Sequence, residues 1–216
     1  MALFNLAHLK FLLDGVWWTL VLSLLAFVGG GLLGFLVALG RLYGPRPLRS
    51  AVGLYIKLIQ GLPLLVLLPL AYFGLPSLGV EVKPLTAAAL ALSIYVSAYL
   101  GDIWRGCIES VPRTQREAAE CLALRWHQQL LHVILPQAVR IATPPTVGFM
   151  VQIVKNTSLA SAIGFVELAR AGQIINNSTF EPFVIFVVVA ALYFALCYPL
   201  SVLSRRLERS FHVAHR

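Results

Sequence analysis

The chain has 216 residues, of which 59% are hydrophobic and only 12% are charged. In a soluble domain of this length about a quarter of the residues are charged, so the composition argues against a large soluble helical domain. The formal net charge is +8, but the basic residues lie at the ends of apolar runs and form no polar face, which argues against nucleic acid as a partner. We expect an all-α integral membrane protein in contact with lipid.

The first expected membrane span covers residues 16–40, which contain no charged residue. A helix of this length crosses a hydrocarbon core of roughly 30 Å. Trp17 and Trp18 stand at one end, where indole rings prefer the membrane interface. No basic segment or small-residue cleavage site precedes the run, so we expect it to be retained as a span. Small residues that let another helix approach closely recur at every fourth position, namely Gly30, Gly34 and Ala38.

Four more spans are expected farther along the chain. The second carries Pro63 and Pro69, so it should be kinked or locally unwound. The fourth carries Pro144 and Pro145, and we expect a broken helix over about residues 140–156, followed by re-entrant or short helical structure. The single domain covers residues 1–216, and its four further spans are 52–74, 85–104, 138–156 and 182–204.

The basic residues predict the orientation of the spans. Twelve of the 17 Lys and Arg residues fall in three segments, which are the linker after the first span, residues 105–140 in the middle of the chain and the C-terminal tail. With five spans, all three segments lie on the same side of the membrane. The positive-inside rule places that side in the cytoplasm. The N-terminus is therefore expected outside and the C-terminus in the cytoplasm.

The middle block, residues 112–137, is a polar, helix-forming insert between the third and fourth spans. Its segment from Thr114 to Glu117 has the pattern of a capping box, with Thr114 as the N-cap residue. Ala119 and Ala123, four residues apart, leave a shallow surface on one side of the predicted helix. The block is expected to form a short helix at the cytoplasmic membrane surface. Spacing alone leaves open that Glu117 only caps its own helix and that the block is an interfacial loop.

Several motifs in a fixed order resemble one known family. In the middle block, "EAA" is followed four residues later by a small residue and then by "ILP", which is similar to the EAA loop of ABC importer permeases. The other motifs look like those of the polar amino-acid permeases, of the histidine, glutamine and glutamate/aspartate type, and the resemblance runs from about residue 15 to 209. These motifs are "GLPLLVLLPLAYFGLP" (61–76), "SAYLGDIWRGCIESVPRTQREAA" (97–119), "LPQAVR" (135–140) and "KNTSLASAIGFVEL" (155–168).

The resemblance implies that the middle block is a coupling helix that docks in a groove on a cytoplasmic ATPase subunit. A small-residue face suits insertion into a groove, and a charged flank suits a polar rim. The chain departs from the family at Thr114 and Ala123, where the family usually has Gly. Alanine keeps the volume small but restricts the turn. The block also contains a proline that is expected to end or kink a second helical piece. The residues assigned to this contact are Glu117, Ala118, Ala119, Ala123 and Pro136.

The partners follow from what the chain lacks and from the resemblance. It contains no GxxxxGK[ST] phosphate loop, so we expect a non-catalytic transport subunit without a cofactor or metal of its own. ATP and Mg²⁺ are expected on a dimer of ATPase subunits. Solute capture is expected from a separate periplasmic or tethered amino-acid-binding protein. Five helices are too few to enclose a path, so a second permease chain, identical or different, is expected to pack against the small-residue spans. The three cysteines, Cys107, Cys121 and Cys197, match no zinc or redox spacing and are expected to be free thiols.

Polar residues within expected spans are the candidates for the substrate path, because ionisable groups in a membrane are rarely incidental. Lys155 could pair with a substrate carboxylate. Alternatively, its side chain could extend to the outer membrane interface, and the next three residues could serve as helix caps and not as substrate contacts. The absence of a nearby carboxylate favours an acidic or neutral polar amino acid. The candidates in the fourth span are Gln152, Lys155, Asn156, Thr157 and Ser158, and those in the second are Gln60, Gly61 and Pro63.

These features favour an ATP-driven importer permease that works by alternating access in the bacterial inner membrane. A stand-alone secondary transporter driven by an ion gradient is the alternative, but such proteins usually show an internal repeat and carboxylates inside the membrane. No repeat is found, and Asp102 and Glu167 fall at predicted span ends. Asp102 and Arg105 are expected to form a structural ion pair. A membrane scaffold that only anchors an ATPase is a second alternative.

Overall fold

The computed structural model describes residues 5–213 of the chain, with side chains described up to residue 210, and this part is helical and contains no β-strand. The all-α expectation is confirmed. The helices are α1 (Leu6–Tyr43), α2 (Arg46–Gly61), α3 (Leu64–Ser77), α4 (Pro84–Glu109), α5 (Arg113–Cys121), α6 (Trp126–Gln128), the π-helical turn η1 (Gln129–Ile134), α7 (Leu135–Asn156), the 3-10 segment η2 (Thr157–Ile163), α8 (Leu168–Thr179) and α9 (Pro182–Val213).

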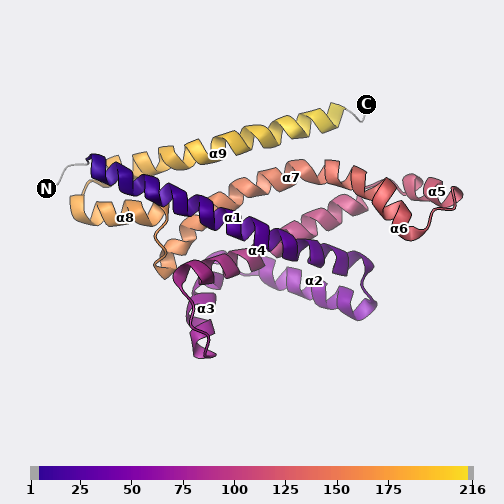
Figure 1. Ribbon diagram of the computed structural model, residues 1–216, viewed down its shortest axis with the longest axis horizontal. Coiled ribbons are helices and arrows are strands. Elements are labelled where there is room, and N and C mark those ends of the chain that lie inside the picture. Colours follow the sequence, from indigo (N-terminus) through magenta and orange to yellow (C-terminus); the bar gives the residue numbers. More distant parts are fainter. Residues whose placement is uncertain (1–4, 214–216) are drawn as a thin grey trace.

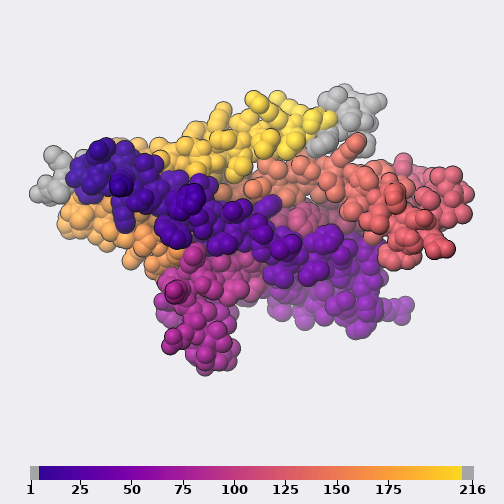
Figure 2. Space-filling view, viewed as in Figure 1, coloured from indigo at the N-terminus to yellow at the C-terminus, as the bar shows by residue number. Residues whose placement is uncertain are grey.

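The long helices run roughly along the long axis of the molecule (Figure 1). α5 and α6 lie at one end, and α8 lies at the other end beside the start of α1. α3 turns away from this direction and stands out from the body in the space-filling view (Figure 2). The middle block and the segment after α7 are therefore at opposite ends of α7.

The centre of the fold is the contact between α1 and α4, which depends on glycine. Gly30 and Gly34 are buried, and Ala38 is only 1% exposed. A Cβ at Gly30 would lie 2.5 Å from Val96 Cγ1, and one at Gly34 would lie 3.2 Å from the backbone nitrogen of Gly101. The predicted close approach is confirmed, but the partner is a helix of the same chain. α4 thus covers the glycine stripe, and the expected packing of a second permease chain against the small-residue spans stays a prediction.

Within the described part of the chain, three helices, α1, α4 and α9, are long and apolar enough to cross a membrane. Two pairs pass the same test together but are bent, α2 with α3 by 104° and the stretch Trp126–Ile163 with α8 by 49°. The first bend lies at Leu62 and Pro63, which confirms the predicted kink, whereas Pro69 lies inside α3 without breaking it. Five spans result if each bent pair is one span, and that number stays a prediction.

The prolines of the fourth expected span do not break its helix, so this prediction is wrong. Pro144 and Pro145 lie inside the continuous helix α7, which packs against α4 and α9, and the Ser204 hydroxyl donates to the Pro144 carbonyl at 3.0 Å. We infer that packing on both sides offsets the roughly 3 kcal/mol that an interior proline costs. The break comes after Asn156 instead, where the chain continues as η2.

Pro136 also does not end or kink a helix as predicted. It occupies the first turn of α7, where a missing backbone N–H costs little. The preceding residues form the π-helical turn η1, and the Leu135 N–H reaches back to the Leu130 carbonyl, five residues earlier. A π-helical turn widens the ring closed by each hydrogen bond. The chain therefore passes from α6 through η1 into α7 without a break.

Candidate functional site

Helix α5 of the middle block starts two residues earlier than predicted. Helix α5 begins at Arg113, its N-cap residue is Pro112, and no side chain caps its first turn. The predicted capping box from Thr114 to Glu117 is therefore wrong. Thr114 already lies inside the helix, because Pro112 has the extended backbone (ψ 137°) that suits the position before a first turn. The alternative explanation for Glu117 was that it only caps its own helix, and the structure shows no such cap.

The surface of α5 separates the assigned residues into two groups. Glu117 and Ala118 are exposed, whereas Ala119 is only 3% exposed and faces the rest of the chain. Ala123 and Pro136 are exposed. The shallow surface predicted between Ala119 and Ala123 is therefore not available to a partner, and the accessible part of the motif is the Glu117–Ala118 side.

The end of α5 forms a tight helix-terminating turn at Ala123. The Leu124 N–H donates to the Ala119 carbonyl at 3.1 Å, and the Ala123 N–H donates to the Glu120 carbonyl at 2.8 Å. This pair of bonds is the Schellman pattern, which places one residue in the left-handed region. That residue is Ala123, with a φ of 54°. The restriction expected from alanine at this position is therefore present as a strained backbone.

The α5 segment is attached to the ends of α4 and α7. Val111, at the turn before α5, is 2% exposed and packs in a small core with Ile108 of α4 and Ile134 of η1. α5 itself packs against η1. The Gln137 side chain donates to the Gln115 side chain at 3.4 Å. A force applied to α5 would therefore reach α7 through η1.

The predicted substrate-path residues at the end of α7 fall into two groups that differ in where their side chains lie. Gln152 and Lys155 are exposed and three residues apart, so they share one face of the helix. Asn156 is 9% exposed, and its Oδ1 accepts a hydrogen bond from Gln152 Nε2 at 3.0 Å. Gln152 and Asn156 are thus in contact, and Gln152 shares an exposed face of α7 with Lys155.

Thr157 and Ser158 do not belong to that face. Thr157 is fully buried, and its hydroxyl donates to the Val154 carbonyl at 2.8 Å. The Ser158 hydroxyl donates to the Lys155 carbonyl at 2.7 Å. Both hydroxyls serve the change from α7 to η2, as the helix-capping explanation proposed. The assignment of Thr157 to an open path is wrong, because the side chain has no exposed surface.

The second group of candidates lies at the corner between α2 and α3. Gln60 is partly exposed, and Gly61 and Pro63 are exposed. Among the described residues, no hydrogen bond or ion pair joins this corner to Gln152 or Lys155. α3 packs against η2, so the corner adjoins the segment that follows Lys155. The two groups are thus connected through packing and not through polar contacts.

Three aromatic residues beside the α7 face were missed by the sequence analysis. Tyr95 and Tyr99 of α4 have ring centroids 4.5 Å apart, and Tyr99 stacks on Phe149 of α7 at 5.5 Å with an interplanar angle of 18°. All three side chains are partly exposed. Two tyrosines four residues apart in an apolar span were a usable signal, because such a spacing places both hydroxyls on one side of a helix.

Glu167 was expected at a span end, but its carboxylate lies at a buried junction of three helices. It accepts hydrogen bonds from the backbone nitrogens of Ala169 at 3.0 Å and Arg170 at 2.9 Å, at the start of α8. It also accepts from the hydroxyls of Tyr193 in α9 at 2.6 Å and Thr19 in α1 at 3.5 Å. A fully buried carboxylate is tolerated when its lone pairs are satisfied in this way.

Ion pairing and cysteine chemistry agree with the predictions. Arg105 and Asp102 form an ion pair at 2.8 Å, and Arg105 also pairs with Glu109 at 2.5 Å. Both pairs lie within α4. The three cysteines are free thiols. Among residues 5–213, no cluster of His, Cys, Asp or Glu is suited to a metal ion.

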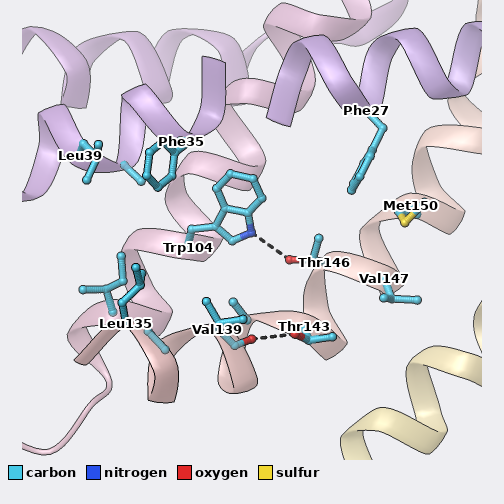
Figure 3. Close-up of a pocket in the computed structure, with 14 residues that line it drawn as sticks. Phe27, Phe35, Leu39, Trp104, Leu135, Val139, Thr143, Thr146, Val147 and Met150 are labelled. Carbon is cyan, nitrogen blue, oxygen red and sulfur yellow. Dashed lines mark hydrogen bonds between the residues drawn. The ribbon is translucent and has the colours of Figure 1, made fainter. Parts of the chain in front are cut away.

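A cavity of about 370 Å³ lies between α1, α4 and α7 (Figure 3). Its few polar groups are occupied within the chain, since Trp104 Nε1 donates to Thr146 Oγ1 at 2.9 Å and Thr143 Oγ1 donates to the Val139 carbonyl at 2.7 Å. The remaining wall is apolar, with Phe27, Phe35, Leu39 and Met150 among its residues. The cavity is therefore unsuited to a polar solute, and the candidate path is the Gln152–Lys155 face.

The chain is similar in sequence and in structure to known transport proteins. The chain is 34% identical to the probable amino-acid ABC transporter permease protein YckA of Bacillus subtilis, covering 93% of this chain and 89% of the relative. It is 37% identical to the L-cystine transport system permease protein TcyB of the same species (90% and 86%) and 34% identical to the glutamine transport system permease protein GlnP of Escherichia coli (94% and 93%).

The solved structures agree with the sequence relatives. A chain in the crystal structure of an amino acid ABC transporter with histidines superposes with a TM-score of 0.89 at 33% identity, covering 97% of this chain and all of the other. A chain of the inward-facing MetNI methionine ABC transporter has a TM-score of 0.79 at 19% identity, covering 96% and 99%, and shows the shared fold alone.

These relationships favour an ABC permease over an ion-driven secondary transporter. Residues 30–213 match the family described as the binding-protein-dependent transport system inner membrane component. That region contains α2 to α9 and more than a third of α1. The chain belongs to this family of inner-membrane transport components.

Proposed function

We propose that this chain is the permease subunit of an ATP-driven importer for polar amino acids in the bacterial inner membrane. The substrate class is supported by the relatives, which include permease proteins of glutamine and L-cystine transport systems. It is also supported by the polar side chains of Gln152, Lys155 and Asn156 on one face of α7.

The observation that carries the proposal is the exposed side of α5. Glu117 and Ala118 are accessible at one end of the molecule, on a short helix that packs against η1 (Figure 1). A protruding helix with a small residue beside a charge suits a groove with a polar rim on a partner. We assign this groove to a cytoplasmic ATPase subunit, and we assign α5 to the role of coupling helix.

The proposed mechanism is alternating access driven by closure of the ATPase dimer, which binds ATP and Mg²⁺. Closure would move α5, and the contact of α5 with η1 would pass the movement into α7. Lys155 at the far end of α7 would pair with the substrate carboxylate, and Gln152 and Asn156 would meet its other polar atoms. The Glu167 junction would hold the start of α8 against α1 and α9 while α7 moves.

The proposed topology has five spans, with the N-terminus outside and the C-terminus in the cytoplasm. A second permease chain completes the path, and a binding protein delivers the solute from outside. Because α4 covers the glycine stripe of α1, the second chain has to use another surface. The exposed candidates Gln60, Gly61 and Pro63 remain assigned to the path at the corner between α2 and α3.

Co-purification tests the coupling assignment. The chain is expressed with the products of its neighbouring genes, extracted in mild detergent, and compared with the variants Glu117→Arg and Glu208→Arg. Glu208 is an exposed glutamate on α9 and serves as a matched charge-reversal control. We expect the ATPase to accompany the native chain and the control, and to be lost or uncoupled in Glu117→Arg.

Two results would contradict the proposal. If no ATPase accompanies the native chain in any mild detergent, the central assignment fails. If Glu117→Arg keeps both the ATPase and its stimulation by the binding protein, α5 is not the coupling element.

A further inference from the structure

The apolar cavity between α1, α4 and α7 lies on the face of α7 opposite the candidate path (Figure 3). The α7 residues that line it recur every three or four positions between Leu135 and Met150, so they share one face of the helix. At about 100° per residue, Gln152 and Lys155 fall on the other side of α7. An occupant of the cavity would therefore be distinct from the solute on the path.

The cavity is long and narrow. It extends along α7 from Leu135 to Met150 and along α1 from Phe27 to Leu39, which is about 20 Å at a rise of 1.5 Å per residue. One leaflet contributes roughly 15 Å to the hydrocarbon core, so the cavity is long enough for an extended acyl chain. Its volume of about 370 Å³ is several times too small for a further helix of the same length, which is about 10 Å across with its side chains. The shape thus favours a lipid chain over a helix of a second permease subunit.

The cavity reaches the surface between α1 and α7, where membrane hydrocarbon surrounds the protein. Phe35 of α1 and Val139 of α7 both line the cavity and are exposed. Leu36, next to Phe35, is exposed as well. Because α1 is long and apolar enough to cross a membrane, exposed apolar side chains in its middle contact lipid. An acyl chain can therefore enter the cavity from the bilayer without crossing water.

A positive charge without a partner stands beside one end of the cavity. Arg140 follows Val139 on α7, and its side chain is exposed. Both ion pairs among the described residues belong to Arg105, which two acids of α4 already neutralise. Arg140 has no acidic partner in that part of the chain. Arginine binds phosphate groups through paired N–H donors, and basic residues beside membrane helices are typical of sites for anionic lipid headgroups.

We propose that the cavity between α1, α4 and α7 binds one acyl chain of an anionic phospholipid, whose phosphate is held by Arg140. The acyl chain would supply the van der Waals contacts that the walls of an empty cavity lack. A zwitterionic lipid offers the same acyl chain but no net charge. One basic residue near the membrane surface predicts a preference of about fivefold for the anionic lipid. This inference requires only that the chain spans the membrane, whichever solute it transports.

Fluorescence quenching by brominated lipids tests the site, because Trp104 lines the cavity. The full chain, with the subunits that co-purify with it, is reconstituted in mixtures of phosphatidylglycerol and phosphatidylcholine, one of which carries bromine on its acyl chains. One variant keeps only Trp104, with the other tryptophans replaced by phenylalanine. The control variant keeps only Trp17, which is exposed on α1 far from the cavity and reports ordinary lipid contact. We expect brominated phosphatidylglycerol to quench Trp104 with about fivefold higher affinity than brominated phosphatidylcholine, and Trp17 to show no preference.

Two substitutions in the Trp104 variant localise the lipid. Ala142→Phe places a ring in the cavity and is expected to abolish the quenching, whereas Ala190→Phe, at an exposed alanine of α9, is expected to leave it unchanged. Arg140→Gln is expected to remove the fivefold preference for phosphatidylglycerol, and Arg206→Gln, at an exposed arginine of α9, to keep it. Because Arg140 is exposed, its variant is expected to fold even if the overpacked Ala142→Phe does not.

Three results would overturn the inference. If neither brominated lipid quenches Trp104, the cavity holds no acyl chain. If both lipids quench Trp104 equally, or if Arg140→Gln keeps the preference, Arg140 holds no anionic headgroup. If Trp104 is quenched in the isolated chain but not in the assembled complex, a partner subunit covers the cavity. None of these results bears on ATP-driven uptake, so the inference can fail while the proposed function stands.

Discussion

Adding one methyl group at Gly30 tests the packing of α1 on α4. In Gly30→Ala the new Cβ would lie 2.5 Å from Val96 Cγ1 and 2.9 Å from the Ser93 carbonyl oxygen. Either the two helices have to move apart or the Val96 side chain has to shift. Overpacking of this kind costs about 1–3 kcal/mol. Alanine also favours a helix over glycine by roughly 0.5–1 kcal/mol, which partly offsets that cost.

The neighbouring glycine, Gly31, provides a control in which alanine contributes the same helix preference as at Gly30. A Cβ at Gly31 would meet only Trp104, at 3.8 Å. Gly31→Ala gains the same helix preference without the clash, so the two variants should differ by about 1–3 kcal/mol in unfolding free energy. For a chain of this length, that is about 2–12 °C in the midpoint of thermal unfolding.

The assay is thermal unfolding of each purified variant in the same detergent, with Gly30→Ala expected to unfold at the lower temperature. Oligomeric state is measured in parallel. If Gly30→Ala is as stable as Gly31→Ala, the close approach of α1 and α4 is refuted. If it dissociates a permease dimer without lowering the unfolding temperature, the glycine stripe belongs to a subunit interface after all.

Two further predictions concern strain and burial. Ala123→Gly relieves the left-handed backbone at the end of α5 and should stabilise the chain by about 0.5–1 kcal/mol, seen as higher resistance of the middle block to proteolysis; unchanged cleavage would contradict the strain. Glu167→Gln places an amide donor against another donor, because both carboxylate oxygens accept hydrogen bonds. It should lower the unfolding free energy by about 1–3 kcal/mol. Tyr193→Phe removes one of the same bonds, so the double variant should cost less than the sum of the two; additive losses would show that the two groups do not interact.

Features with a strong local cause were predictable from the sequence. Uncharged apolar runs predicted α1, α4 and α9, because only a helix of that length satisfies its backbone in lipid. Pro63 predicted a kink, and the chain bends there by 104°. The ion pair of Asp102 and Arg105 followed from their spacing on one helix.

Features decided by packing were not predictable from local pattern. Pro144 and Pro145 argued for a broken helix, but α7 continues through them as one helix that packs against α4 and α9. Thr114 had the spacing of a capping residue, but Pro112 starts the helix earlier. The glycine stripe correctly predicted a close helix contact, but spacing does not tell which helix approaches, and the structure shows that it is α4.

The candidate site shows the same division. Gln152 and Lys155 were identified because polar groups are unusual in a span, and both are exposed on one face. Thr157 passed the same test and is buried, since its direction depends on how α7 changes into η2. Tyr95 and Tyr99 lie beside this face only because α4 packs against α7, a contact that the order of residues does not reveal.

Uptake into sealed vesicles tests the central claim of ATP-driven import most directly. The chain, its ATPase and its binding protein are reconstituted so that ATP can be supplied on the ATPase side, and entry of radiolabelled glutamine is followed. The account predicts uptake that requires ATP and the binding protein, that is unaffected by ionophores, and that is abolished by Glu117→Arg but not by Glu208→Arg. Uptake that persists without ATP and collapses when an ionophore removes the ion gradient would contradict it.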